Sequence, residues 1–446
     1  MGQILSHPKT EKTSEEGGDK FVAFGLSCMQ GWRVSMEDSH STILNINTLI
    51  EDSNKHSKKQ NAFFAVYDGH GGEKVAIFTG ENLPKILAKD EKYLNGDYIQ
   101  SLKDVFLATD VAILGDSEIG NDPSGCAATS TLITEDAIYC ANAGDSRCVL
   151  SIDGVVKPLS FDHKPTNEGE KNRIVNAGGF VDMGRVNGNL ALSRGIGDFE
   201  FKDAKSLPAE EQAVTALPDV LEHKLDTNHD EFIVLACDGI WDCLTSQQVV
   251  DFVRRYVKEG KSLIEISELM MDTCLAPTSG GSGIGCDNMS VCIVALLHNG
   301  ETLDEWYKRI SSKISDEDLQ KLPTADELSN DLYNVDIESK LSETKGNGTE
   351  GSKLSGLRAG SGDFDDDDDD ENADDLLKRG APALLQQLLS ASATNSNYNI
   401  IHFDPSASSI LQSLVVAKDD NEEGEGEDND NDNDNDKVEE ITDESK

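Results

Sequence analysis

The chain has 446 residues, with 39 Lys and Arg against 84 Asp and Glu, and a formal net charge of −45. This length allows a large core in one to three domains, and a surface this acidic repels phosphate backbones, which argues against nucleic acid as the main partner. Ten acids lie in Asp363–Asp375, and 15 acids and three lysines lie in Lys418–Lys446; without these two segments the net charge is still −23.

The nine cysteines are scattered along the chain, and no two of them form a C-x-x-C pair. Neither a zinc knuckle nor a disulfide framework is therefore indicated, and we expect buried thiols in a reducing compartment. We see no stretch long and apolar enough to span a bilayer and no signal peptide before the fold. We expect an intracellular protein, cytoplasmic and nuclear, without a transmembrane segment.

Residues 1–19 are expected to form a flexible leader. Met1 to Ser6 fits the M-G-x-x-x-[ST] pattern of N-myristoylation; the alternative is a chance match. An acyl chain on Gly2 would give only weak, reversible membrane contact.

A first strand is predicted over residues 21–30, and the stretch that follows it contains Arg33, Glu37 and Asp38. In an extended chain Arg33 and Glu37 would project from one face, while Asp38 would point the other way or lie in a turn. Acids for a cation beside a planar fork of donors suit a phosphate ester held on a metal. The alternative is a surface salt bridge of little energetic value.

Residues 61–67 (NAFFAVY) read as a buried strand that stops at Asp68, Gly69 and His70, followed by two more glycines. Glycine allows positive φ, so a peptide carbonyl can approach whatever the acid holds. A carboxylate, a bare carbonyl and an imidazole together suit a hard cation next to a proton donor. The alternative is a hydrophilic turn into the next helix.

The middle of the chain alternates helices and hairpins. Helical spacing of apolar residues is seen over 73–89 and 97–114, and Pro84 is expected to kink or break the first of these helices. Paired short strands flank Glu135-Asp136 and Asp153-Gly154, which indicates antiparallel sheet. A further helix is predicted over 167–177.

Arg185 and Arg194 lie in glycine-rich sequence. Each could bind an anion or merely cap and pair with neighbouring groups, and the sequence alone favours the second interpretation.

The pattern of an apolar strand with an acid at its end recurs twice. The apolar run over residues 231–237 stops at Asp238, and Asp242 follows four residues later. A buried strand is predicted over 290–297, with Asp287 and Asn288 just before it. With Glu37, Asp38, Asp68 and Asp145, these acids are hard to explain as surface solvation.

The C-terminal third changes character. Helical segments are expected over 304–316 and 326–340, and from about residue 342 the composition is typical of disorder. Two apolar islands, 376–389 and 400–417, are interpreted either as docking segments that fold on a partner or as residual apolar content in a linker.

The chemistry open to these groups is metal-assisted hydrolysis. Carboxylate oxygens favour Mg²⁺ or Mn²⁺ over zinc, and two ions bridged by one aspartate would lie about 3.5–4 Å apart and lower the pKa of a shared water. Arg33 could hold the phosphoryl oxygens, and His70 could protonate the departing alkoxide. No cysteine-phosphatase loop and no P-loop are present in the sequence.

Six ordered motifs make the resemblance specific: G-W-R-x-S-M-E-D, Y-D-G-H-G-G, A-G-D-S-R, R-V-N-G-N-L-A-L-S-R-G-I-G-D-F, A-C-D-G-I-W-D and C-D-N-M-S. The chain resembles metal-dependent serine/threonine protein phosphatases of the type 2C family, particularly fungal members with an acidic C-terminal extension. The resemblance implies an α+β fold, a four-layer α-β-β-α sandwich with two central antiparallel sheets over residues 20–300. A helical extension (301–341) and a largely disordered acidic tail (342–446) would follow. We expect a monomer that acts on phosphoserine and phosphothreonine proteins.

The resemblance also implies a role for each site residue. Asp68 would bridge two metals, Glu37 and the Gly69 carbonyl would complete one site, and Asp238 and Asp287 the other, with Asp38 acting through water. Asp145 and Asp242, with Asp238, would form a weaker third site. Arg33 would bind phosphate, His70 would be the general acid, and Arg185 would contact the phosphoprotein.

One departure from the family pattern is Ala127, where relatives usually have a threonine near the metals. It keeps open a second reading, a catalytically impaired phosphatase-fold protein that acts through its tail. A third reading, a two-metal phosphodiesterase for nucleotides, is disfavoured by the acidic surface and by the order of the motifs.

Overall fold

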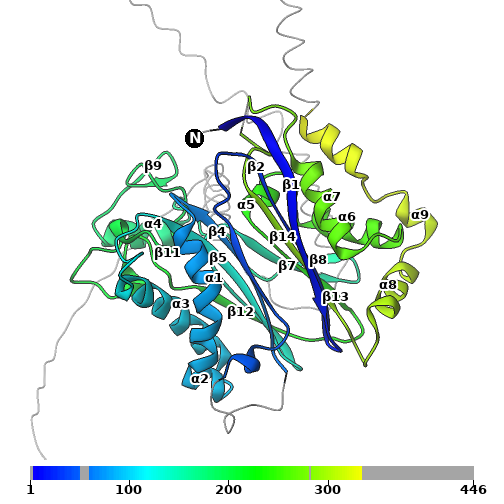
Figure 1. The fold of residues 1–446 in the computed structure, drawn as a ribbon, viewed down its shortest axis with the longest axis horizontal. Coiled ribbons are helices and arrows are strands. Elements are labelled where there is room, and N and C mark those ends of the chain that lie inside the picture. The colour runs from blue at the N-terminus through cyan, green and yellow to red at the C-terminus, as the bar shows by residue number, and fades with distance from the viewer. Residues whose placement is uncertain (1–3, 51–59, 281–282, 334–446) are drawn as a thin grey trace, which may run out of the picture. The chain divides into compact units, whose positions relative to one another are not determined.

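A computed structural model describes residues 4–50, 60–280 and 283–333 of the chain. In these residues a pair of β-sheets lies face to face, and helices cover the outer face of each sheet (Figure 1). The expected α+β four-layer α-β-β-α arrangement is therefore confirmed. The predicted acidic tail and both apolar islands lie outside the described residues.

Both sheets are antiparallel throughout. The first has the order β1 (Ile4–Gly18), β2 (Val22–Arg33), β14 (Met289–Leu296), β13 (Asp230–Ala236), β7 (Arg147–Ile152) and β8 (Val155–Pro158). The second has the order β12 (Asp219–Lys224), β6 (Ala137–Ala143), β5 (Gly125–Ile133), β4 (Ala62–His70) and β3 (Ser39–Ile43), with β11 (Ile196–Gly197) beside β5. A separate ribbon joins β9 (Val181–Asp182) to β10 (Arg185–Val186).

The helices divide between the two outer faces. The second sheet is covered by α1 (Lys74–Lys89), α2 (Glu91–Leu94) and α3 (Tyr98–Gly115), and the first by α6 (Ser246–Lys258), α7 (Leu263–Cys274) and α8 (Leu303–Ser312). The others are α4 (Glu168–Asn176), α5 (Asp238–Trp241) and α9 (Asp316–Leu319), with 3₁₀ turns at Ile46–Leu49, Phe199–Phe201 and Ala209–Glu211. Helical backbone also covers residues 325–333.

The predicted hairpins are confirmed by the strand register. β5 pairs with β6 across Glu135 and Asp136, and β7 pairs with β8 across Asp153 and Gly154. The backbone φ angles of Asp153 and Gly154 are +48° and +84°, as expected for a two-residue turn that matches the twist of its strands.

Three features of the backbone differ from the sequence prediction. The first is the N-terminal segment. It was expected to be a flexible leader, but residues 4–18 form β1, an edge strand paired with β2. Its side chains are mostly polar, so no apolar alternation reveals it; instead Lys12 bonds Asp272 at 2.6 Å and Ser14 bonds Glu268 at 2.6 Å, both on α7.

The second is Pro84, which lies inside a continuous α1 and does not break it. Proline has no N–H for the carbonyl four residues earlier, and that carbonyl belongs to Gly80. The Ser41 hydroxyl on β3 donates to it at 2.9 Å, so a tertiary contact replaces the missing helical hydrogen bond.

The third is the stretch after the first strand. β2 ends at Arg33, and residues 34–38 form a loop that leads into β3. Glu37 and Arg33 therefore do not share a strand face, and the loop itself positions both acids.

Alternation along β4 explains where Asp68 lies. Phe63, Ala65 and Tyr67 belong to the core under α1 and α3, whereas Phe64 and Val66 belong to the core between the sheets. Successive side chains of a strand point to opposite faces, so Asp68 continues the inter-sheet face at the strand's end.

All nine cysteines are free thiols and buried, which confirms the expectation of buried thiols. Five of them lie in the core between the sheets: Cys28, Cys140, Cys148, Cys237 and Cys292. Burial raises the pKa of the Cys28 thiol to about 12, so this thiol is protonated at neutral pH.

Candidate active site

The predicted acids converge because antiparallel neighbours meet at one edge of the first sheet. β13 ends just before Asp238, β14 begins two residues after Asp287, and β2 ends at Arg33. Asp68 reaches the same region from the end of β4 in the second sheet. The acidic cluster consists of Glu37, Asp38, Asp68, Asp238 and Asp287.

The charges of this cluster act strongly on one another. Burial and then the negative charges of Asp238, Asp38, Asp287 and Asp145 raise the pKa of Asp68 well above its usual range. Burial, Asp145 and Asp287 do the same for the pKa of Asp238. Groups that repel in this way either bind protons or share a cation.

The hydrogen bonds of Asp38 also indicate that this cluster requires a proton or a cation. Asp38 Oδ2 accepts a hydrogen bond from Ser290 at 2.7 Å, while its buried Oδ1 has no partner among the described residues. Burial and the charge of Asp287 raise the pKa of Asp38 to about 6, although the hydrogen bond from Ser290 opposes this shift. An unpaired buried carboxylate oxygen is costly, and a divalent cation or its bound water would satisfy it.

The Glu37 carboxylate accepts hydrogen bonds from its own loop and from the segment that follows β4. Its Oε1 accepts from the Ser35 hydroxyl at 2.7 Å, and its Oε2 accepts from the Gly72 N–H at 3.1 Å. The backbone of Gly69 passes so close that a Cβ there would lie 2.1 Å from the Glu37 carbonyl oxygen. Only glycine fits at 69, and the reason is this close approach to the Glu37 backbone. The positive φ that the sequence pattern led us to expect occurs at Gly71 (+70°) and Gly72 (+137°) and not at Gly69.

Asn288 is a site residue that sequence reasoning missed. Its Oδ1 accepts from the Glu37 N–H at 2.9 Å, and its Nδ2 donates to the carbonyls of Gln30 at 2.8 Å and Ser35 at 3.0 Å. One buried amide thus ties the Glu37 loop to the start of β14. The motif C-D-N-M-S contained this residue, but only the tertiary contacts reveal its partners.

Arg33 lies at the edge of the cluster and forms an ion pair with Asp287. Its side chain is 40% exposed, so its remaining donors are open to solvent. Burial, opposed mainly by the charge of Arg33, raises the pKa of Asp287.

His70 is paired with Asp198, a second residue that was not singled out from the sequence. Its Nε2 lies 2.8 Å from Asp198 Oδ1 and 2.9 Å from Oδ2. Burial alone would lower the pKa of His70, but the charge and hydrogen bond of Asp198 outweigh it and raise that pKa. Asp198 has a φ of +52° and packs where a Cβ on Gly125 would clash, 2.2 Å from its Oδ2.

The proposed third-site acids lie beside the main cluster. Asp145 Oδ2 forms an ion pair with Lys164 at 2.6 Å, and its charge is one of those that raise the pKa of Asp238. Burial, moderated by Lys164, raises the pKa of Asp242. Lys164 provides positive charge here that the sequence analysis did not foresee.

The two glycine-flanked arginines differ. Arg194 is bound by Glu170 at 2.8 Å and Asp219 at 2.9 Å, so its role is structural. Arg185 is exposed on the β9–β10 ribbon, where it donates to the Asn189 carbonyl at 2.7 Å, and keeps donors for other groups.

Ala127 lies opposite Asp68 in the β4–β5 pairing and is buried in a small apolar cluster with Ile174 and Val186. Ala127 packs tightly on Gly144: a Cβ added at Gly144 would lie 2.4 Å from the Ala127 Cβ. Thr129, two residues on, has a buried hydroxyl without a partner in the described residues.

In residues 4–50, 60–280 and 283–333, no three His, Cys, Asp or Glu side chains form a ready-made metal ligand set. The donor set of the acidic cluster, carboxylates and the Gly69 carbonyl, is nevertheless the oxygen-only chemistry that Mg²⁺ and Mn²⁺ prefer. Among the described helices none is long and apolar enough to cross a membrane.

Comparisons with known proteins identify one family. The family model for protein phosphatase 2C matches residues 22–283. Protein phosphatase 2C homolog 3 of Schizosaccharomyces pombe is 57% identical over 319 residues, 71% of this chain and 75% of the relative. Protein phosphatase 2C homolog 2 of Saccharomyces cerevisiae is 54% identical over 315 residues, 70% of this chain and 67% of the relative.

Among solved structures, that of a phosphatase from a pathogenic strain of Toxoplasma gondii matches with a TM-score of 0.53 and 25% identity. The match covers 64% of this chain and 95% of that one. Since the family model spans more than half of the sequence and curated relatives share over half of their aligned residues, this chain belongs to the protein phosphatase 2C family.

Proposed function

We propose that this phosphatase hydrolyses phosphoserine and phosphothreonine esters in proteins, with two Mg²⁺ or Mn²⁺ ions at the acidic cluster. The supporting observation is the convergence of acids from four separate chain segments beside Arg33 and the His70–Asp198 pair. Burial, together with the charges of Asp238, Asp38 and Asp287, raises the pKa of Asp68, and a hard cation would relieve the repulsion between these charges.

The residues divide between two ions and a weaker third. Asp68 would bridge the pair, Glu37 and the Gly69 carbonyl would hold one ion, and Asp238 and Asp287 the other. Asp38 would act through water, which suits its unpaired Oδ1. The ions would supply the charge that lowers the pKa of a water enough for it to attack phosphorus.

The weaker ion would lie between Asp145, Asp242 and Asp238. The pKa of Asp238 and the pKa of Asp242 are both raised in part by the charge of Asp145, and the Lys164 ion pair would compete for this site.

The chain's own groups then orient the ester and move a proton. Arg33 would hold the non-bridging phosphoryl oxygens with the donors it does not use on Asp287. The bond from phosphorus to the serine or threonine oxygen breaks as the bond to the water oxygen forms. His70, kept protonated by Asp198 at Nε2, would give the Nδ1 proton to the leaving oxygen.

Arg185 would contact the phosphoprotein. It stands on an exposed ribbon whose turn also presents Met183, which is 93% exposed. A polypeptide substrate could meet both, whereas a small phosphate ester would need neither.

The test measures Mn²⁺-dependent phosphate release from a phosphothreonine peptide and from a cyclic or dinucleotide, for wild type and Asp238→Ala. Peptide hydrolysis that is lost in Asp238→Ala supports the proposal. An inert wild type favours the impaired regulatory protein, and preference for the nucleotide favours the phosphodiesterase.

A further inference from the structure

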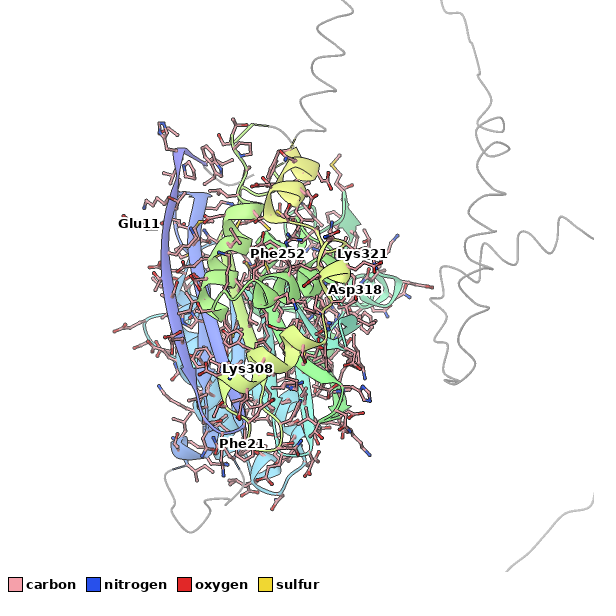
Figure 2. The ribbon with its side chains drawn as sticks, turned by 90° about the vertical axis from the view of Figure 1, so that its right-hand side faces the viewer. Glu11, Phe21, Phe252, Lys308, Asp318 and Lys321 are labelled. Atoms are coloured by element: carbon pink, nitrogen blue, oxygen red, sulfur yellow. The ribbon has the colours of Figure 1, made fainter. Side chains whose placement is uncertain are left out.

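The chain after β14 packs beside α6 on the first sheet: α8 contacts both α6 and β14, and Trp306 Nε1 donates to the Glu231 carbonyl of β13 at 2.9 Å. Figure 2 views this side: Lys308 of α8 lies below Phe252 of α6, and Asp318 of α9 and Lys321 lie to the right of Phe252. Trp306 of α8 is fully buried in the same core as Phe252. The helical extension is thus an integral component of this layer.

The last described helix, residues 325–333, is anchored at its start. Thr324 and Glu327 bond each other's backbone and side chains in a capping box. The Ala325 N–H donates to the Tyr256 hydroxyl of α6 at 2.8 Å, and Leu328 is 2% exposed in the core. Figure 1 shows this helix in yellow at the upper right.

At its end this helix presents Tyr333 to the C-terminus of α7. The Tyr333 hydroxyl donates to the carbonyl of Cys274, the final residue of α7. Carbonyls in the last turn of a helix have no intrahelical donor. This carbonyl takes its donors from other segments: the Tyr333 hydroxyl, 59 residues away, and the Cys243 thiol at 3.6 Å. A Cβ on Gly285 would lie 2.1 Å from the tyrosine oxygen, so the contact requires glycine there.

Tyr333 also packs against residues that directly precede two groups of the active site. The cluster consists of Trp32, Ala276 and Cys286, with Leu275 and Tyr333 against it. Trp32 Nε1 donates to the Ala276 carbonyl at 2.9 Å. Trp32 precedes Arg33 and Cys286 precedes Asp287, and these two next residues form an ion pair.

We propose that Tyr333 is a positioning residue for the active site. By fixing the end of α7 and the Trp32–Cys286 cluster, it holds Asp287 and Arg33 at the distances that metal and phosphate binding require. The helical extension thereby sets how tightly the acidic cluster binds its ions. This inference rests on the proposed function, since it assigns the metal and phosphate to those residues.

The test uses the full-length chain, stripped of metal with a chelator, and measures Mn²⁺ binding by titration calorimetry. The variants are Tyr333→Phe, which loses only the hydroxyl, and Tyr333→Ala. Tyr307→Phe is the matched control, because the Tyr307 hydroxyl also bonds a helix backbone group, the Leu263 N–H at 2.9 Å, but is not in contact with the cluster behind Asp287. Thermal unfolding of each variant is recorded in parallel.

We expect Tyr333→Phe to weaken Mn²⁺ binding about fivefold, the change that loss of one average hydrogen bond produces. Tyr333→Ala should weaken it further, and excess Mn²⁺ should restore kcat in the Phe variant. Tyr307→Phe should bind Mn²⁺ as wild type does. Unchanged Mn²⁺ affinity in Tyr333→Phe overturns the inference. The Tyr333→Phe result tests the positioning role even if Tyr333→Ala does not fold.

Asp238→Ala distinguishes a failure of the positioning role from a failure of the proposed function. Mn²⁺ binding that is lost in Asp238→Ala but unchanged in Tyr333→Phe removes the positioning role alone. Asp238→Ala with the Mn²⁺ affinity and peptide activity of wild type removes the proposed function, and the positioning role with it.

Discussion

Replacing Asn288 tests whether a buried amide holds the loop of Glu37 in place. Asn288→Ala leaves three groups without their partner, the N–H of Glu37 and the carbonyls of Gln30 and Ser35. At about 1 kcal/mol for each hydrogen bond, the expected loss of unfolding free energy is about 3 kcal/mol. In a domain of this size that lowers the Tm by about 6 °C.

The loss should not stop at stability, because Glu37 is a proposed metal ligand on that loop. We expect weaker Mn²⁺ binding by calorimetry, and a smaller rise in Tm when Mn²⁺ is added. Asn61→Ala is the matched control: Asn61 is also a buried amide, bonded to the hydroxyls of Tyr93 at 3.0 Å and Tyr98 at 3.4 Å near the start of β4.

Asn61→Ala should therefore lower the Tm while Mn²⁺ affinity stays at the wild-type value. If both variants lose stability and neither loses Mn²⁺ affinity, Asn288 is only a packing residue and the reasoning is refuted.

Three further changes probe the same site. His70→Ala should slow release of phosphate from a phosphothreonine peptide by about 10²–10⁴-fold but affect p-nitrophenyl phosphate far less, since nitrophenolate leaves without a proton; equal losses would contradict the acid role. The raised pKa of Asp38, about 6, favours the folded state while the group is protonated, so this contribution is present below the unfolded pKa and is lost as pH rises through about 6. We expect the Tm in chelator to fall between about pH 4 and pH 7, and we expect Mn²⁺ or Asp38→Asn to reduce that fall. An equal fall of the Tm in wild type and in Asp38→Asn would count against this role of Asp38. Gly69→Ala places a Cβ 2.1 Å from the Glu37 carbonyl oxygen, so we expect Mn²⁺-dependent activity to be lost in a protein that still unfolds cooperatively, and wild-type activity would show that the close approach is dispensable.

The sequence predicted the architecture well where local patterns decide it. The apolar runs over 61–67, 231–237 and 290–297 form β4, β13 and β14, and Asp153-Gly154 forms the tight turn it indicates. Antiparallel pairing then brings the acids at the strand ends to one edge, so the acidic cluster follows from where its strands stop.

What the sequence did not predict depends on contacts between distant segments. β1 has polar side chains whose partners are on α7, 254 or more residues away. The hydroxyl that compensates for Pro84 comes from β3. Asp198 and Asn288 look like ordinary polar loop residues until folding places them against His70 and Glu37.

Alkylation of the five thiols between the two sheets can be used to detect separation of the sheets. Thiols react with alkylating agents only as exposed thiolates, and burial raises the pKa of Cys28 to about 12 and the pKa of Cys148 well above its usual range. Alkylation at these positions therefore requires the sheets to separate. The rate at which alkyl groups appear in the mass spectrum would thus measure how often the two sheets separate. If Mn²⁺ binds at the acidic cluster as proposed, it should slow that labelling.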